Sequence, residues 1–226
     1  MRQMRLGMLA VLLASGAAMA QGGVGSGDVS TGMASPMQAA AMRGLSAFAA
    51  QFGKMDDRLP PGFPLALADA GDLHGVRIGW GFQVYDVDAA ALASKANLED
   101  VARPTGIWRY EVLAKGRPVG LATVAKTSQG WQVVSFGGTG LARDIHALMV
   151  SHGTRADTHL RYVRVPQATA DFIAVQRGGA PARFAPLQAA RDLLQGQGHG
   201  VPRDGLLDGA VLRAQLRQAV KTNGAN

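Results

Sequence analysis

The 226-residue chain contains no cysteine. This absence excludes disulfide bridges, thiolate metal ligands, a cysteine nucleophile and a cysteine lipid anchor. Lysine is also scarce, since 18 of the 23 basic residues are arginine, and 16 acidic residues leave a formal net charge of +7. The arginines are scattered along the chain, whereas a nucleic-acid-binding face needs basic residues gathered on one element. We therefore expect no nucleic-acid partner.

Long hydrophobic runs are absent beyond the first 20 residues. Arg2 and Arg5 precede the apolar stretch 6–18, which ends in the small-x-small pattern Ala18-Met19-Ala20. This order is typical of a secretory signal peptide over 1–20. A spanning helix needs about 20 apolar residues, so we expect no membrane span after cleavage. The predicted location is the periplasm, with the extracellular space as the alternative.

The rest of the chain divides by composition into three parts. Five glycines in 21–35 predict a flexible linker. Segment 36–195 carries periodic apolar patterns and predicts a single α+β domain, which must be held by its core alone because no disulfide can form. Segment 196–226 predicts a glycine-rich linker followed by a C-terminal amphipathic helix.

The expected elements follow from apolar periodicity and capping residues. Ser35, Asp88, Thr139 and Asp208 are expected to cap helices. Helices are expected over 36–55, 89–96, 139–150, 187–194 and after Asp208. Strands are expected over 65–67, 76–87, 107–114, 119–125, 131–136, 160–165, 172–175 and 183–185. Short strands joined by polar turns predict an antiparallel meander over 107–136, so the fold class is an α+β sheet with helices packed mainly on one face.

The meander carries a resemblance to a known type of module. Its residues are Gly106-Ile107-Trp108-Arg109-Tyr110-Glu111-Val112, a polar turn, and then Gly130-Trp131-Gln132-Val133-Val134. Together with the preceding helix they resemble the helix-plus-meander layout of cystatin-like or PepSY-type exported modules. The resemblance implies inhibitor, propeptide or scaffold roles, although a fold does not settle a function.

Aromatic side chains form one candidate ligand site. Trp80, Trp108, Tyr110 and Trp131 all fall on expected strands. Lining one sheet face, they would form a ligand groove; packed beneath helices, they would be core residues. The sequence leaves both interpretations open.

The turn Gly137-Gly138-Thr139-Gly140 is a candidate anion-binding site. A glycine-rich strand-to-helix turn presents backbone N–H groups to an anion. This turn lacks the lysine of a P-loop and the spacing of a dinucleotide fingerprint. The alternative is a tight turn capped by Thr139.

Catalytic and metal-binding patterns are weak. Ser135 precedes a helix, but no Gly-x-Ser-x-Gly elbow surrounds it, and its alternating strand pattern favours a structural role. His146, His152 and His159 are spaced by six and seven residues, whereas a helical zinc pair is typically three or four residues apart. The six-residue spacing leaves His146 and His152 about 120° off a shared helix face. His152 is instead expected at a helix C-terminus, where the helix dipole favours a cation. We therefore expect no catalytic site, metal or cofactor.

The functional expectation is an exported, non-enzymatic module for protein interaction or envelope assembly. Its partner would be an unidentified envelope or secreted protein. Binding could use a sheet edge or the apolar face of the final helix, formed by Leu212, Leu216 and Val220. The alternatives are a small-molecule carrier that uses the aromatic sheet face, and an exported hydrolase with an unobvious site.

Overall fold

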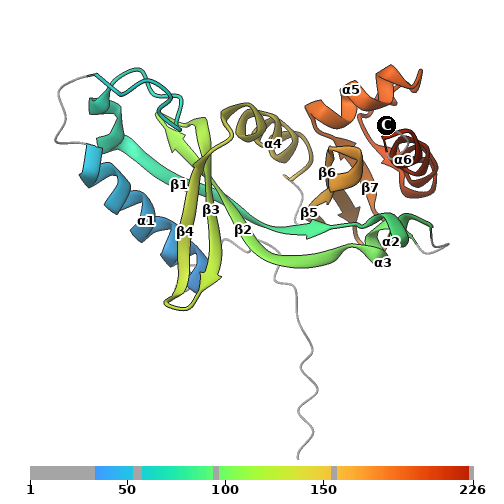
Figure 1. Cartoon of the computed structure of the whole chain (residues 1–226), viewed down its shortest axis with the longest axis horizontal. Coiled ribbons are helices and arrows are strands. Elements are labelled where there is room, and N and C mark those ends of the chain that lie inside the picture. The colour runs from blue at the N-terminus through green and yellow to red at the C-terminus, as the bar shows by residue number, and fades with distance from the viewer. Residues whose placement is uncertain (1–33, 53–57, 94–96, 154–156, 224–226) are drawn as a thin grey trace, which may run out of the picture.

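The computed structural model describes residues 34–52, 58–93, 97–153 and 157–223. The expected signal peptide and nearly all of the expected linker 21–35 lie outside these residues. The described chain folds around one eight-stranded sheet with the strand order β4-β3-β2-β1-β5-β6-β7-β8. Figure 1 shows the long strands β1 and β2 joining the two halves of the molecule.

The element bounds are as follows. The strands are β1 (Val76–Asp86), β2 (Arg103–Ala114), β3 (Arg117–Thr127), β4 (Gly130–Gly137), β5 (Thr158–Val165), β6 (Ala170–Arg177), β7 (Arg183–Pro186) and β8 (Leu207–Asp208). The helices are α1 (Pro36–Phe52), α2 (Ala89–Ala93), α3 (Leu98–Val101), α4 (Thr139–His152), α5 (Gln188–Gly196) and α6 (Gly209–Asn223), with short 3-10 turns η1 (Ala70–Gly75) and η2 (Pro166–Ala168).

The predicted fold class is confirmed: the protein is α+β and its sheet is mostly antiparallel. The meander β2-β3-β4 forms as expected, and β1 extends it to four strands. The exception is the pair β1–β5, which is parallel over only three residues of each strand, Val84–Asp86 and Tyr162–Arg164. This pair joins the first four strands to the last four.

Helices cover both faces of the sheet, with most on one face. Tyr110 and Val112 of β2 pack under α1, whereas Ile107 of the same strand packs with α4. Because neighbouring side chains of a strand point to opposite faces, α1 and α4 lie on opposite sides of the sheet. The face under α1 continues across β5 and β6, where α2, α3 and α6 enclose a second core cluster. Figure 1 shows α4 between the two halves, on the side away from α1.

Several local expectations are confirmed by capping contacts. The Ser35 hydroxyl accepts a hydrogen bond from the backbone N–H of Gln38, at the start of α1. The carboxylate of Asp88 accepts one from Ala91 at α2, and the carboxylate of Asp208 accepts one from Ala210 at α6. Such contacts satisfy amide groups that a helix N-terminus leaves without partners.

Other local expectations are wrong. Thr139 does not cap α4: Gly138 occupies the cap position in a left-handed conformation, and the Thr139 hydroxyl donates to the Val119 carbonyl instead. Segment 65–67 forms no strand, although the Ala66 N–H donates to that same Val119 carbonyl. By contrast, the helix expected over 89–96 is confirmed over Ala89–Ala93, and residues 94–96 lie outside the described chain.

Candidate functional site

Two hollows in the structure run along strand edges. The first, here called the edge groove, has a volume of about 630 Å³ and lies between α1 and β4. The second, here called the strand cleft, has a volume of about 420 Å³ and lies between β1 and β5. Both volumes fall in the range of ligand-binding sites.

The edge groove reaches the backbone of β4. All six consecutive residues 131–136 line it. A hollow on one sheet face would be lined by alternate residues only, because successive side chains point to opposite faces. The consecutive lining therefore places the groove along the edge of β4, which is the last strand of the sheet on that side.

The opposite wall of the edge groove is a stripe of α1 at helical spacing. The stripe consists of Ala40, Arg43, Gly44, Ala47, Phe48 and Gln51. Three of these six residues are alanine or glycine, so the helix backbone approaches the strand closely. An added Cβ at Gly44 would lie 2.3 Å from a Val133 methyl carbon. The only sign of this stripe in the sequence is the run of small residues in the helix.

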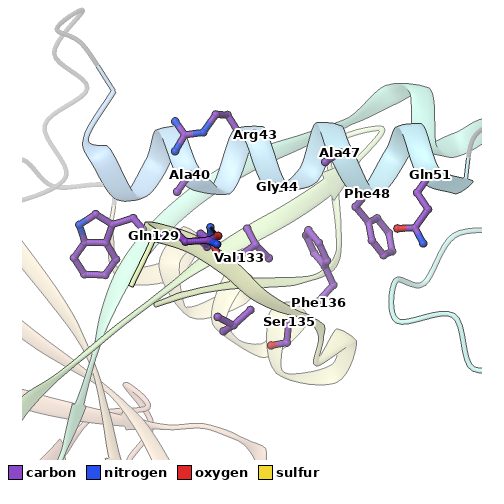
Figure 2. A pocket seen from close by; sticks show the side chains of 13 residues that line it. Ala40, Arg43, Gly44, Ala47, Phe48, Gln51, Gln129, Val133, Ser135 and Phe136 are labelled. Atoms are coloured by element: carbon purple, nitrogen blue, oxygen red, sulfur yellow. Dashed lines mark hydrogen bonds between the residues drawn. The ribbon is translucent and has the colours of Figure 1, made fainter. Parts of the chain in front are cut away.

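Aromatic rings close one end of the edge groove. Figure 2 shows Phe48 of α1 and Phe136 of β4 pointing toward one another, and their ring centroids are 4.5 Å apart. Phe63 also packs on Phe48, at 5.4 Å. The rest of the lining mixes polar and apolar side chains, and within it the Gln132 side-chain amide donates to Gln129 at 2.9 Å.

The strand cleft arises where two paired strands separate. Upstream of their short parallel pairing, residues 80–83 of β1 and 158–162 of β5 line opposite sides of the cleft. The lining is again consecutive on both strands, so the cleft passes between strand edges. Gly81 contributes no side chain here, and an added Cβ would lie 2.1 Å from the Tyr110 ring.

The walls of the strand cleft are rich in rings. They include Trp80, Phe82, Tyr85, Trp108 and Tyr162. The Phe82 and Tyr162 rings lie 5.3 Å apart, and the guanidinium of Arg161 lies over the Tyr85 ring at 5.7 Å. Arg109 donates to the Tyr162 hydroxyl at 3.3 Å. Burial, and then the nearby carboxylate of Asp171, raise the pKa of Tyr162, so this phenol stays protonated at neutral pH.

A buried carboxylate lies next to the cleft residue Trp80. Glu111 is only 1% exposed, and its Oε1 lies 3.2 Å from Nδ1 of His146 on α4. The Trp80 ring stacks on the His146 ring at 5.4 Å. Burial raises the pKa of Glu111, while the neighbouring His146 opposes that rise. The second carboxylate oxygen of Glu111 is buried without a hydrogen-bond partner.

The structure divides the four aromatic residues of the predicted ligand site. Trp80 and Trp108 line the strand cleft, and Trp131 lines the edge groove. Tyr110 is buried under α1, where it packs on Trp108 at 6.4 Å, and burial raises the pKa of its hydroxyl. The four therefore share no single groove, because the sheet separates them into two hollows and a core.

The glycine-rich turn forms as expected between β4 and α4. Gly137 and Gly138 both have positive φ angles, of 148° and 69°. Gly140 lies in the first turn of α4, and the Thr139 hydroxyl is engaged with the Val119 carbonyl. Anion binding by these backbone groups stays a prediction. Ser135, the candidate nucleophile, lies exposed on β4 and lines the edge groove.

The final helix is packed on the rest of the chain. Leu212 and Leu216 are fully buried in the core cluster of β5 and β6, and Val220 packs against it. Leu207 of β8 also pairs with Phe184 of β7. The prediction that Leu212, Leu216 and Val220 form a partner-binding face is therefore corrected. These side chains pack on the domain's own core, where they shield the apolar face of the last strands from water.

His152 differs from its expected role as a cation at a helix end. It lies in the last turn of α4, but burial and then the charge of Arg177 lower its pKa. The Arg177 guanidinium approaches its Nδ1 at 3.5 Å. Both effects disfavour the imidazolium, which the helix dipole alone would favour.

Among the described residues, no group of three or more histidine, aspartate or glutamate side chains could hold a metal ion. Within the same part of the chain, no helix has both the length and the apolar character to cross a membrane.

Comparisons of the chain with models of known protein families, with curated proteins and with solved structures gave no significant match.

Proposed function

We propose that this protein is an exported, non-enzymatic interaction module that captures an extended segment of a partner protein along β4. The observation that carries the proposal is the consecutive lining of the edge groove by residues 131–136, opposite a helix stripe of small residues. An edge strand beside a helix is the geometry in which a peptide adds one more strand to a sheet.

The edge groove supplies both parts of such recognition. As the edge strand of the described sheet, β4 offers backbone N–H and C=O groups, which bind an extended chain of almost any sequence. Alternate side chains of the incoming segment would face the sheet surface under α1, where Trp131, Val133 and Phe136 lie. Selectivity would come from an apolar residue that packs on these three side chains.

Charge favours an acidic partner segment. Arg43 is the charged residue in the lining of the edge groove, which contains no carboxylate. The chain without residues 1–20 carries 21 basic and 16 acidic residues, a net charge of +5. Opposite charge on the partner would speed its encounter with this surface and discriminate against basic segments.

Export rests on the N-terminal sequence pattern. The charged start, apolar stretch and Ala18-Met19-Ala20 pattern favour secretion. The proposed partner is accordingly another envelope or secreted protein. The first test is to detect the processed N-terminus in an envelope fraction by mass spectrometry, which an intact Met1 in all of the protein would contradict.

Two matched variants of α1 test capture at the edge groove. Ala47 and Ala50 are both exposed on α1, but only Ala47 lines the groove. We expect Ala47→Arg to fill the groove and abolish binding of acidic extended peptides selected from a random library. Ala50→Arg adds the same charge outside the groove and should leave binding unchanged.

Hydrogen exchange locates the bound peptide. We expect backbone amides of 130–137 to gain protection when peptide is added, because an added strand pairs with the free edge. Equal binding by the two arginine variants, or protection confined to other strands, would overturn the proposal. A turnover assay on ester, glycoside and peptide substrates with Ser135→Ala tests the hydrolase alternative; activity lost in that variant would favour it.

A further inference from the structure

The strand cleft is independent of the edge groove, since the two share no lining residue. We propose that the strand cleft binds a small aromatic anion. The cleft, the rings and the charge of its lining each support one part of this proposal.

The size and closure of the cleft favour a small molecule over a peptide strand. The parallel pairing of Val84–Asp86 with Tyr162–Arg164 closes one end. Met149 and Gly153, from the C-terminal end of α4, contribute to the lining. A volume of about 420 Å³ accommodates a ligand of one or two fused rings, near the lower end of small-molecule sites.

The rings around the cleft favour an aromatic ligand. Trp80 belongs to the α4 side of the sheet, where it stacks on His146, and Trp108 belongs to the α1 side, where it packs on Tyr110. A planar ligand inserted between the strand edges would therefore meet aromatic surface from both sides of the sheet. Trp80 is 42% exposed, which is unusual for so large an apolar side chain. A ligand stacked on it would cover surface that the fold leaves in water.

The polar lining favours an anion. Arg161 and His159 line the cleft, together with the side-chain amides of Gln83 and Gln176, and the lining contains no carboxylate. None of the ion pairs found among the described residues uses Arg161. Its guanidinium is held over the Tyr85 ring. This stacking fixes the position of the guanidinium and leaves its N–H groups available to donate hydrogen bonds.

A buried hydroxyl at the cleft adds a donor for a carboxylate. Thr158 belongs to the lining, and its side-chain oxygen is buried without a hydrogen-bond partner among the described residues. A hydroxyl can donate to an anionic oxygen, and a hydrogen bond to a charged acceptor is stronger than one between neutral groups.

Tryptophan fluorescence gives a direct readout of binding. The chain has three tryptophans, and Trp131→Phe leaves only the two that line the strand cleft. The probes are 2-naphthoate and its neutral counterpart, 2-naphthylmethanol. In the Trp131→Phe protein we expect 2-naphthoate to change the fluorescence saturably and to raise Tm, and we expect the alcohol to bind at least about fivefold more weakly.

A pair of charge-matched variants isolates the arginine. Arg161→Gln should weaken 2-naphthoate binding about tenfold, whereas Arg143→Gln removes the same charge from an exposed position on α4 and should not change it. Circular dichroism checks that each variant is folded, and Gln83→Leu provides a second test of the polar lining if Arg161→Gln is not. The absence of saturable 2-naphthoate binding, equal affinity for acid and alcohol, or unchanged affinity in the cleft variants would overturn the proposal.

Ligand binding at the strand cleft and peptide capture at the edge groove can be tested separately. Ala47→Arg should leave 2-naphthoate binding unchanged, because Ala47 does not line the strand cleft. In the protein without substitutions at either site, naphthoate binding without peptide capture, or peptide capture without naphthoate binding, would identify which of the two proposals fails.

Discussion

The imidazole of His146 reaches from α4 to the sheet and places its Nδ1 3.2 Å from Oε1 of Glu111, a carboxylate that is almost completely buried. This contact joins α4 to the central strand β2. The second oxygen of Glu111 has no hydrogen-bond partner among the described residues. His146 is the group that most strongly offsets the cost of burying this carboxylate.

Stability should depend on pH through Glu111. Burial raises the pKa of Glu111, so the folded protein holds this proton more tightly than the unfolded chain does. The ordinary pKa of a glutamate is about 4.3. The stabilisation from the bound proton is fully present below that value and is lost as the pH rises through the higher pKa of the folded state.

Glu111→Gln removes this dependence. The free energy of unfolding of the wild type should fall relative to that of the variant as the pH rises from about 4 to about 8. Urea denaturation across that range measures the difference. A constant difference, or one that grows in favour of the wild type, would show that attraction to His146 outweighs the cost of burial.

His146→Ala should destabilise the protein by about 1–3 kcal/mol, because it leaves a buried carboxylate without its partner. Chemical denaturation near neutral pH measures this, with the exposed His74→Ala as the control, for which we expect a change within about 0.5 kcal/mol.

A double-mutant cycle tests whether the effect comes from the contact. His146→Ala combined with Glu111→Leu should cost less than the sum of the two single changes, by about 0.5–3 kcal/mol. Strict additivity would mean that the two side chains contribute independently.

Gly44→Ala should destabilise the protein by forcing α1 away from β4. The added Cβ would lie 2.3 Å from a Val133 methyl, and overpacking of this kind costs about 1–3 kcal/mol. Shortening the neighbour in Gly44→Ala/Val133→Ala should recover part of that loss. Thermal unfolding measures both.

Gly140→Ala is the control, because it is also a helical glycine but has open space around its Cβ position. Alanine there should leave the protein unchanged or stabilise it by up to about 1 kcal/mol, through reduced freedom of the unfolded chain. Equal losses in the two alanine variants would contradict the packing explanation.

Two residues of α6 should differ sharply in their effect on stability. Leu216 is fully buried and Val211 is 52% exposed on the same helix. Leu216→Ala should cost about 2–5 kcal/mol, because it opens a cavity in the core. Val211→Ala should change the free energy of unfolding by about 0.5 kcal/mol or less.

This comparison decides the role of the final helix. If Leu216→Ala lowers the free energy of unfolding only slightly, α6 is loosely attached, and a partner-binding role for its apolar face is favoured again. Deletion of 208–226 is a poor test of partner capture for the same reason, since it would also remove the cover of a core cluster.

Local features of the fold could be predicted because their causes lie within a few residues. Ser35, Asp88 and Asp208 each precede a helix and accept a backbone hydrogen bond from its first turn. Alternation and tight turns likewise predicted the β2-β3-β4 meander, in which each strand pairs with the next along the chain. Thr139 is not the cap because α4 begins at Thr139 itself, with Gly138 in the cap position, and its hydroxyl donates to the distant Val119 carbonyl.

Both hollows depend on contacts between distant segments. The strand cleft exists because β1 pairs with β5 across many intervening residues and then diverges from it. Spacing along the chain carries no signal for such a pair, so Trp80 and Arg161 could not be placed together. The edge groove depends in the same way on where α1 lies across β4.

The sequence by itself determined the longer helices and strands, the antiparallel meander and the absence of cysteine chemistry, because these follow from composition and short-range periodicity. Only the tertiary structure decided that Tyr110 is core while Trp80 and Trp108 face a cleft, and that Leu216 is covered by the domain itself. An aromatic or leucine pattern shows that a face is apolar. What covers that face is settled by the packing of elements far apart in the chain.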